Sequence, residues 1–210
     1  LGIYTLDDLY ENWGILRPSP GTASLTDYGT TEIVADPNGT RDQVMSVFFK
    51  EGGYVYNRGV CCGGTEWRTP LKQSNELYLS YDVMFEPGFE FSLGGKLPGL
   101  YGWTDYNEFI GGGKDPDGYN GWSGRLAFKK DGGLAVYVYH AAKTRETWGE
   151  NYWWNNAQFI PGKWHTLEIR YVMNTPGVAN GRIQAWFDGQ PALDTGEKFL
   201  FTNTDALGIN

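Results

Sequence analysis

The sequence has few cysteines, few charged residues and no long apolar run. Only two cysteines occur in 210 residues, Cys61 and Cys62, and because they are adjacent they provide no disulfide framework. They form a vicinal disulfide, stay as two thiols, or pair with a segment outside this chain. No stretch approaches the roughly 20 apolar residues that a membrane-spanning helix requires, so we expect no membrane association.

The chain begins at Leu1, without an initiator Met and without a basic and apolar leader. This start fits a mature protein whose signal peptide was removed, and it also fits a trimmed chain. We expect a secreted, extracellular protein.

Acidic residues outnumber basic ones. The chain has 25 Asp and Glu against 17 Lys and Arg, which gives a net charge of −8 at pH 7. A protein of this charge repels polyanions as a whole, so nucleic acid is not an expected partner. An acidic polysaccharide can still bind if basic side chains converge on one face, because a local field at contact distance outweighs a screened global field. Such a site must be locally basic.

Turn-forming and aromatic residues are abundant, with 30 glycines and 16% aromatic residues, which favours strands joined by tight turns. A short helix is predicted over residues 6–13. Seven strands are predicted, over residues 31–35, 43–49, 76–85, 125–129, 134–140, 164–173 and 182–187. The pattern predicts one all-β domain over residues 1–210, a sandwich or jelly roll.

The two strands that flank residues 129–133 carry the most informative pattern. Alternation places four apolar residues on one face, namely Leu126, Phe128, Val136 and Val138. The other face then carries a hydroxyl, a guanidinium and two phenols, which belong to Ser123, Arg125, Tyr137 and Tyr139. This pairing requires an odd-length loop, such as a three-residue turn over 131–133, because an even loop would set Arg125 opposite a valine.

These groups suit the removal of the C5 proton of a uronic acid, which lies α to a carboxylate. Arg125 can bind the carboxylate through a bidentate fork and so stabilise an enolate-like transition state. A tyrosine beside cations can have its pKa lowered toward neutrality, act as the base, and return the proton to the departing O4. The alternative is an ordinary strand whose tyrosines and arginine have no catalytic role.

Lys96 lies in a segment rich in glycine and proline, residues 94–102, which follows the aromatic segment Phe89-Glu90-Phe91. Such a frame restricts a lysine more than an open surface does. The two histidines, His140 and His165, are favoured as structural residues, since alternation turns His140 away from the tyrosines. Trp122 and His140 are nonetheless included with Lys96 and Arg125 as candidate substrate-binding residues. No metal site is predicted.

These segments resemble polysaccharide lyase family 14, whose members degrade alginate or glucuronan. The motif GGKLPGLYG at residues 94–102 is close to a signature of that family. The likeness continues in the family's order through residues 122–126, 136–139, 161–166 and 174–177, and it extends from about residue 32 to 188.

The resemblance implies a β-jelly roll of two antiparallel sheets with a long open cleft on its concave face. It also implies an endolytic lyase, acting on mannuronate-rich alginate or on glucuronan by β-elimination, with no cofactor and no required metal. In this reading Lys96 and Arg125 handle the carboxylate, and Ser123, Tyr137 and Tyr139 complete the catalytic residues. Which tyrosine transfers the proton, or whether Lys96 is the base, stays open. We expect a monomer whose partner is the acidic polysaccharide.

A noncatalytic carbohydrate-binding module is the alternative function, since a basic, aromatic face binds a polyuronate without reacting with it. A glycoside hydrolase is disfavoured because no predicted strand offers two carboxylates at alternating positions. The aromatic region 147–156 either lines sugar subsites by stacking or forms a hydrophobic loop under the sheet.

Overall fold

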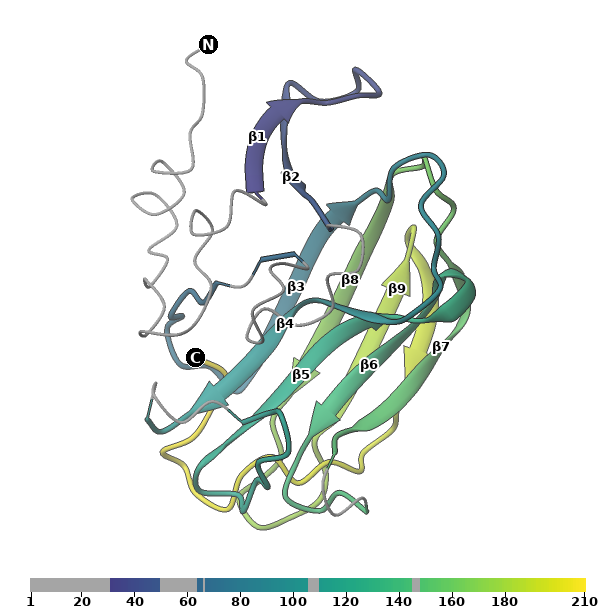
Figure 1. Ribbon diagram of the computed structural model, residues 1–210. Helices are drawn as coiled ribbons and strands as arrows, with labels where there is room; N and C mark the ends of the chain where they lie inside the picture. Colours follow the sequence, from purple (N-terminus) through teal and green to yellow (C-terminus); the bar gives the residue numbers. More distant parts are fainter. Residues whose placement is uncertain (1–30, 50–63, 66, 106–109, 145–147) are drawn as a thin grey trace. The chain divides into compact units, whose positions relative to one another are not determined.

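The computed structural model describes residues 31–49, 64–65, 67–105, 110–144 and 148–210 (Figure 1). The chain divides into two compact units, Leu1–Leu71 and Lys72–Asn210, and the single domain over residues 1–210 stays a prediction. In the first unit, β1 (Thr31–Ala35) pairs antiparallel with β2 (Gln43–Val47). The predicted helix over residues 6–13 and both cysteines lie outside the described residues.

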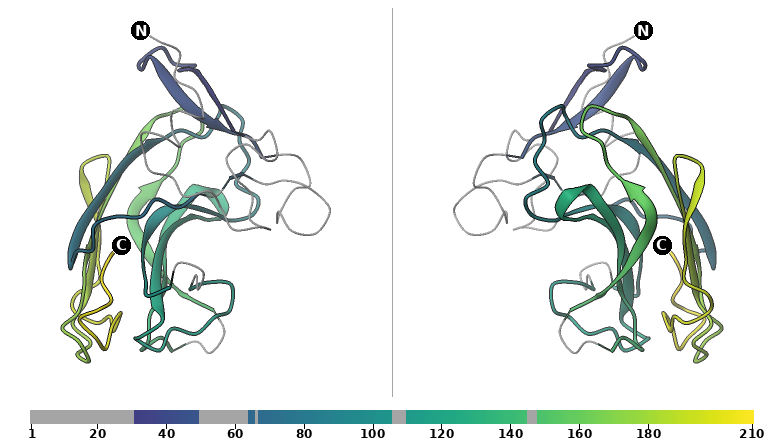
Figure 2. Two further views of the ribbon diagram at one scale, coloured as in Figure 1. Left: turned by 90° about the vertical axis from the view of Figure 1, so that its left-hand side faces the viewer. Right: turned by 90° about the vertical axis from the view of Figure 1, so that its right-hand side faces the viewer.

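The second unit is a sandwich of two four-stranded antiparallel sheets, ordered β10-β9-β8-β3 and β4-β5-β6-β7. Figure 2 views the sheets from the side, where they lie face to face. The strands are β3 (Glu76–Val83), β4 (Gly95–Trp103), β5 (Gly121–Phe128), β6 (Gly133–Tyr139), β7 (Glu150–Gln158), β8 (His165–Val172), β9 (Arg182–Phe187) and β10 (Gln190–Asp194). The all-β prediction is confirmed, and the described residues contain no α-helix.

Side-chain alternation determines which residues form the core between the sheets. On β8, His165, Leu167, Ile169 and Tyr171 are buried while the residues between them are half-exposed, as the sequence pattern predicts. At one end of the core, the ring centroid of Phe85 lies 4.7 to 5.0 Å from those of four other phenylalanines. These neighbours are Phe89, Phe91, Phe128 and Phe159.

Two strands of the β4-β5-β6-β7 sheet, β4 and β7, are not predicted from the sequence. Glycine and proline in β4 resemble a turn, yet the strand lies at the edge of its sheet and its register shifts between Leu97 and Gly99. An edge position and a bulge are the places where a strand tolerates proline. The carbonyl of Pro98 accepts a hydrogen bond from the Tyr81 hydroxyl at 3.1 Å, which ties this bulge to the opposite sheet.

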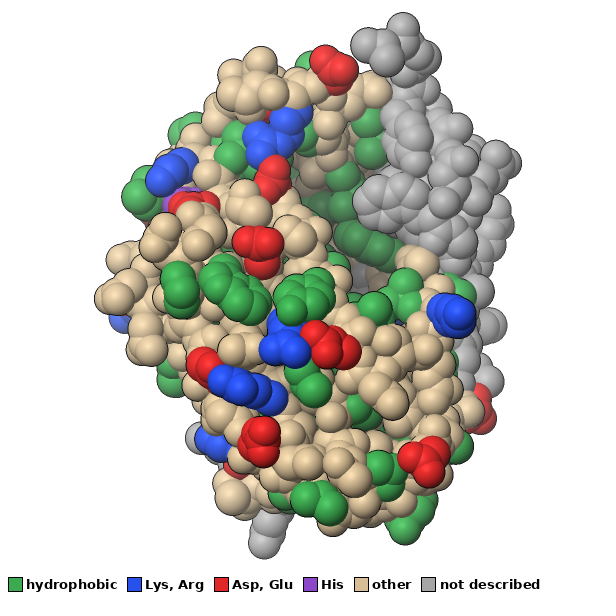
Figure 3. All heavy atoms as spheres, turned by 180° about the vertical axis from the view of Figure 1, so that it is seen from behind, with side chains coloured by type: hydrophobic (Ala, Val, Ile, Leu, Met, Phe, Trp, Pro, Cys, Tyr) green, Lys and Arg blue, Asp and Glu red, His purple; other side chains and the backbone are tan. Residues whose placement is uncertain are grey.

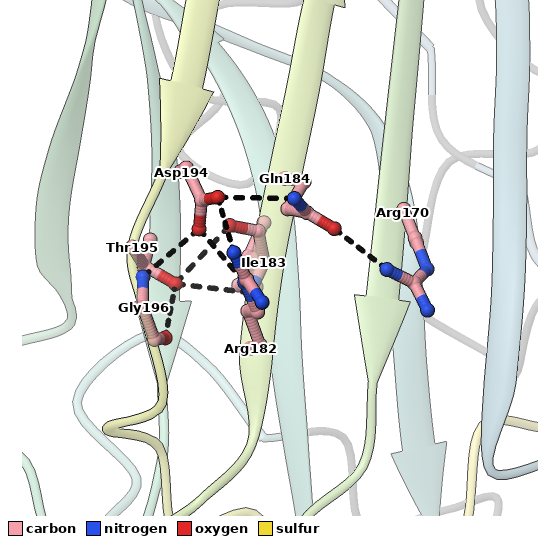
Figure 4. A network of polar contacts seen from close by, with 7 residues as sticks. All are labelled: Arg170, Arg182, Ile183, Gln184, Asp194, Thr195 and Gly196. Carbon is pink, nitrogen blue, oxygen red and sulfur yellow. Dashed lines mark hydrogen bonds and ion pairs between the residues drawn. The ribbon is translucent and has the colours of Figure 1, made fainter.

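The outer face of the β10-β9-β8-β3 sheet carries interspersed acidic and basic side chains (Figure 3). Arg182 binds both carboxylate oxygens of Asp194, and Gln184 joins Asp194 to Arg170 (Figure 4). Arg170 also pairs with Glu76 at 2.7 Å. Because exposed pairs of this kind neutralise one another and add little stability, this face resembles an ordinary solvated surface.

The sheets pack tightly where Gly124 of β5 meets Tyr171 of β8. The Tyr171 hydroxyl donates a hydrogen bond to the Gly124 carbonyl oxygen at 2.6 Å. A Cβ atom at Gly124 would lie only 2.5 Å from the Tyr171 ring. Since Tyr171 is fully buried, it has little room to move, and β5 tolerates only glycine at position 124.

Gly124→Ala should therefore lower the free energy of unfolding by about 1–3 kcal/mol, the usual cost of an overpacked core. Urea unfolding followed by tryptophan fluorescence measures the change. Gly133→Ala is the matched control, because a Cβ there has its nearest neighbour at 4.0 Å. Equal unfolding midpoints for the two variants would show that the contact with Tyr171 does not constrain the fold.

Candidate active site

The outer face of the β4-β5-β6-β7 sheet, which points away from the core, brings the predicted residues together. Arg125 lies opposite Tyr137 and Ser123 opposite Tyr139, which confirms that these four residues share one face. The Lys129 amide donates to the Gly133 carbonyl at 2.7 Å, so the closing loop covers three residues, 130–132. The loop is odd-length as expected, but it begins one residue earlier than the predicted turn over 131–133, so Arg125 pairs with Tyr137 where the predicted turn would pair it with Tyr139.

Strand pairing arranges this outer face in rows that run across the strands. The first row contains Tyr101, Ser123 and Tyr139; the second contains Gly99, Arg125, Tyr137 and Asn151; the third contains Lys96, Ala127, Ala135 and Trp153. Neighbouring rows are about 7 Å apart, because two residues separate them along each strand.

Within the part of the chain that the structure describes, three cations lie against the ring of Tyr137. The Lys96 Nζ lies 4.5 Å from the ring centroid, and the Arg125 Cζ and the Lys129 Nζ each lie 5.7 Å from it. The Arg125 Cζ is also 5.9 Å from the Tyr139 ring. The face is thus locally basic in a chain of net charge −8, as a site for an acidic polymer requires.

The environment shifts the pKa values of Lys96 and Tyr137 in opposite directions. Burial, followed by repulsion from Arg125 and Lys129, lowers the pKa of the Lys96 amine from 10.5 to about 8. Burial and a 3.2 Å hydrogen bond with Tyr139 raise the pKa of the Tyr137 phenol from 10.0 to about 12. The expectation of a tyrosine pKa lowered toward neutrality is therefore wrong for Tyr137, since burial outweighs the nearby Arg125.

The two tyrosines differ in accessibility. Tyr139 is fully buried, and its ring stands nearly perpendicular to that of Tyr137, with an interplanar angle of 88°. Tyr137 is half-buried, and its hydroxyl accepts a hydrogen bond from the Gly149 amide at 3.1 Å. Ser123 is also fully buried, and its Oγ has no hydrogen-bond partner among the residues that the structure describes. Tyr137 is the phenol that an incoming substrate can reach.

Glu150 organises the segment that presents the Gly149 amide. Its carboxylate accepts hydrogen bonds from the Thr144 amide at 2.9 Å, from the Thr144 hydroxyl and from the Tyr152 hydroxyl at 2.8 Å, and it pairs with His140 at 3.0 Å. Burial opposes ionisation of this carboxyl, but these hydrogen bonds outweigh it and lower the pKa of Glu150 to about 2. An ionised Glu150 thus fixes the chain next to the Tyr137 hydroxyl.

Trp122 and His140 lie in the core and not on the outer face. Trp122 is 0% exposed, with its ring centroid 4.6 Å from that of Phe201, and its indole donates to the Gly208 carbonyl at 3.1 Å. His140 is 3% exposed and packs edge-on against Phe199 at 5.0 Å. Neither side chain can contact a polymer, so the substrate-binding role predicted for both residues is wrong.

This face also contains Lys129, Asn151 and Trp153, which the sequence patterns did not single out as site residues. Region 147–156 was left open between a sugar subsite and a loop under the sheet, and most of it forms β7. Along that strand Trp153 is 57% exposed and Trp154 is 6% exposed, so one indole faces outward and the next packs in the core. Period-two alternation within region 147–156 was the available signal.

No group of three or more His, Cys, Asp or Glu in the described ranges is placed to hold a metal ion. Within the same ranges, no helix has the length and apolar character needed to cross a membrane.

Several solved structures share this fold. The PL-14 alginate lyase from Aplysia kurodai is 20% identical, with a TM-score of 0.69 over 90% of this chain and 85% of that one. The alginate lyase vAL-1 from Chlorella virus is 20% identical, with a TM-score of 0.65 over 99% and 87% of the two chains. Alginate lyase Aly36B is 22% identical, with a TM-score of 0.62 over 100% and 79%. These likenesses support the predicted jelly roll.

The sequence comparisons agree with the structural ones. No curated protein sequence matches the chain significantly. The family profile described as Polysaccharide lyase 14, however, matches residues 37–210, which include every strand of the sandwich. The chain belongs to polysaccharide lyase family 14.

Proposed function

We propose that this protein is an endo-acting alginate lyase that cleaves its substrate by β-elimination on the outer face of the β4–β7 sheet. The observation that carries the proposal is the contact between Lys96 and Tyr137, whose pKa values are shifted in opposite directions. Two groups whose pKa values are shifted apart in this way suit the roles of base and acid. Membership in the family supports the same activity, and two Aly36B mutants have been solved with an alginate trisaccharide and tetrasaccharide.

Arg125 is assigned to the carboxylate of the reacting sugar. It lies between Gly99 and Tyr137 in the middle row, and its guanidinium is within 6 Å of both tyrosine rings. A bidentate pair with the carboxylate withdraws charge from the C5 centre and stabilises the enolate-like transition state.

Lys96 is assigned as the base and Tyr137 as the acid. With a pKa of about 8, a useful fraction of Lys96 is the free amine near neutral pH, whereas the Tyr137 phenol, with a pKa of about 12, keeps its proton. The amine takes the C5 proton, the C–H electrons form the C4–C5 double bond, and the C4–O4 bond breaks. Tyr137 protonates O4, and the Gly149 amide stabilises the phenolate that forms.

Tyr139 and Ser123 are assigned as positioning residues because both are fully buried. The Tyr139 hydroxyl contacts the Tyr137 hydroxyl at 3.2 Å and so orients the acid. Ser123 lies opposite Tyr139 in the first row and supports its ring from β5. We further propose mannuronate-rich alginate as the preferred substrate, with glucuronan as the alternative, and action as an extracellular monomer.

Ultraviolet absorbance tests the reaction class, because each elimination leaves a double bond conjugated to a carboxylate. Incubation with polymannuronate, polyguluronate and glucuronan in the presence of a chelator should give rising absorbance, fastest with polymannuronate. Absorbance that stays flat on all three polymers, while the protein still binds one of them, would favour the noncatalytic binding module.

Substitution should separate the acid from its neighbour. Tyr137→Phe is expected to lower kcat by about 10²- to 10⁴-fold, the range for loss of a general acid. Tyr139→Phe loses the same 3.2 Å hydrogen bond and should cost much less, since Tyr139 does not meet the substrate. Steady-state kinetics on polymannuronate measure both variants. A larger loss in Tyr139→Phe would reverse the assignment of the two phenols.

The pH profile tests the role of Lys96. A base must be unprotonated, and the fraction of free amine increases with pH, so kcat/KM should increase as pH rises through about 8. Lys96→Ala should abolish this increase of kcat/KM with pH together with most of the activity. Lys130→Ala, at an exposed lysine in the adjacent loop, should preserve both the increase and the activity. A profile that falls through pH 8 would mean that the reaction needs charged Lys96, as a partner for the carboxylate.

A further inference from the structure

Lys129 and Trp153 lie together on the outer face, beside the residues assigned to the chemistry. The Lys129 Nζ is 5.7 Å from the ring centroid of Trp153 and 5.7 Å from that of Tyr137, so the ammonium is equally close to the indole and to the proposed acid. We propose that Lys129 and Trp153 form a uronate-binding subsite next to the bond that is cleaved. This inference rests on the proposed function of the same face.

Trp153 is built as a platform rather than as a core residue. It projects from β7 with 57% of its surface exposed, while its neighbour Trp154 packs inward with 6% exposed. It belongs to the row that begins at Lys96, and the two residues between them in that row are Ala127 and Ala135. A sugar ring that stacks on this indole would therefore lie in line with the catalytic amine, across small side chains. The apolar C–H face of a pyranose suits such a flat aromatic surface.

Lys129 supplies the charge that a uronate requires. Its side chain is half-exposed, and burial lowers the pKa of its amine. None of the ion pairs within the described residues involves Lys129, and the charged groups that these residues place against the Tyr137 ring are cations. A partly desolvated ammonium without a carboxylate partner is costly, and the carboxylate of a bound sugar would offset that cost.

The two groups together define the ligand class. Stacking on Trp153 alone would accept any pyranose, neutral or charged, whereas Lys129 alone would accept any anion. A ring with an apolar face and a carboxylate on its edge satisfies both groups at once. The subsite should therefore select uronate polymers over neutral polysaccharides.

Steady-state kinetics on polymannuronate test the subsite. Trp153→Ala and Lys129→Ala should each raise KM about tenfold, because the lost contacts hold ground state and transition state alike. The kcat of both variants should stay within about twofold of wild type when it is measured well above pH 8, where removal of the Lys129 charge no longer changes the fraction of free Lys96 amine. Trp153→Phe keeps an aromatic face and should show a smaller increase. Two controls should leave KM unchanged: Lys130→Ala at the next lysine, and Tyr78→Ala, an exposed ring on the opposite sheet that has a cation at the same 5.7 Å.

Affinity electrophoresis separates binding from turnover. In the Tyr137→Phe background the polymer is consumed about 10²- to 10⁴-fold more slowly. Migration should slow in gels that contain polymannuronate but not in gels that contain a neutral glucan. Adding Trp153→Ala or Lys129→Ala should restore most of the mobility.

The two proposals fail in different ways. Unchanged KM and unchanged retardation in both variants would overturn the subsite, and production of unsaturated ends by the wild type would still support the lyase. A wild type that forms no unsaturated product, but whose retardation depends on Trp153 and Lys129, would overturn the lyase and support the subsite.

Discussion

The register of β5 against β6 is the constraint on which the rest of the structure depends. Because side chains alternate along a strand, the pairing of Leu126 with Val136 fills the core, and the pairing of Arg125 with Tyr137 places a guanidinium beside a phenol on the outside. A slip of one residue would bury the charged arginine and expose the aliphatic residues, and both changes would destabilise the fold. The tight loop at 130–132 sets this register, so one short turn positions both the core and the site.

Burial then converts a basic face into a pair of groups with different proton affinities. The same desolvation that lowers the pKa of Lys96 raises that of Tyr137, because the charged form is the ammonium in one case and the phenolate in the other. The cations that gather there oppose the net charge of the chain, while acids elsewhere, such as Asp194, are paired with arginines on the opposite sheet. The site therefore attracts a polyanion that the rest of the protein would repel.

Sequence alone could predict the faces of β5 and β6, because a period of two leaves few choices. It could not predict β4, because its glycines and proline resemble a turn until an edge position and a bulge accommodate them. The burial of Trp122 and His140 depends on Phe199 and Phe201, which are distant in sequence and return to cover them. The direction of the Tyr137 pKa shift likewise required three-dimensional burial, since adjacent cations alone suggested the opposite sign.

A crystal structure of the Tyr137→Phe variant with a bound oligomannuronate tests the central claim most directly. The account predicts the sugar carboxylate on Arg125, the C5 hydrogen facing the Lys96 amine, and the O4 of the scissile bond beside the aromatic ring at position 137. An oligosaccharide bound on the other sheet, or bound here with C5 turned away from Lys96, would contradict it.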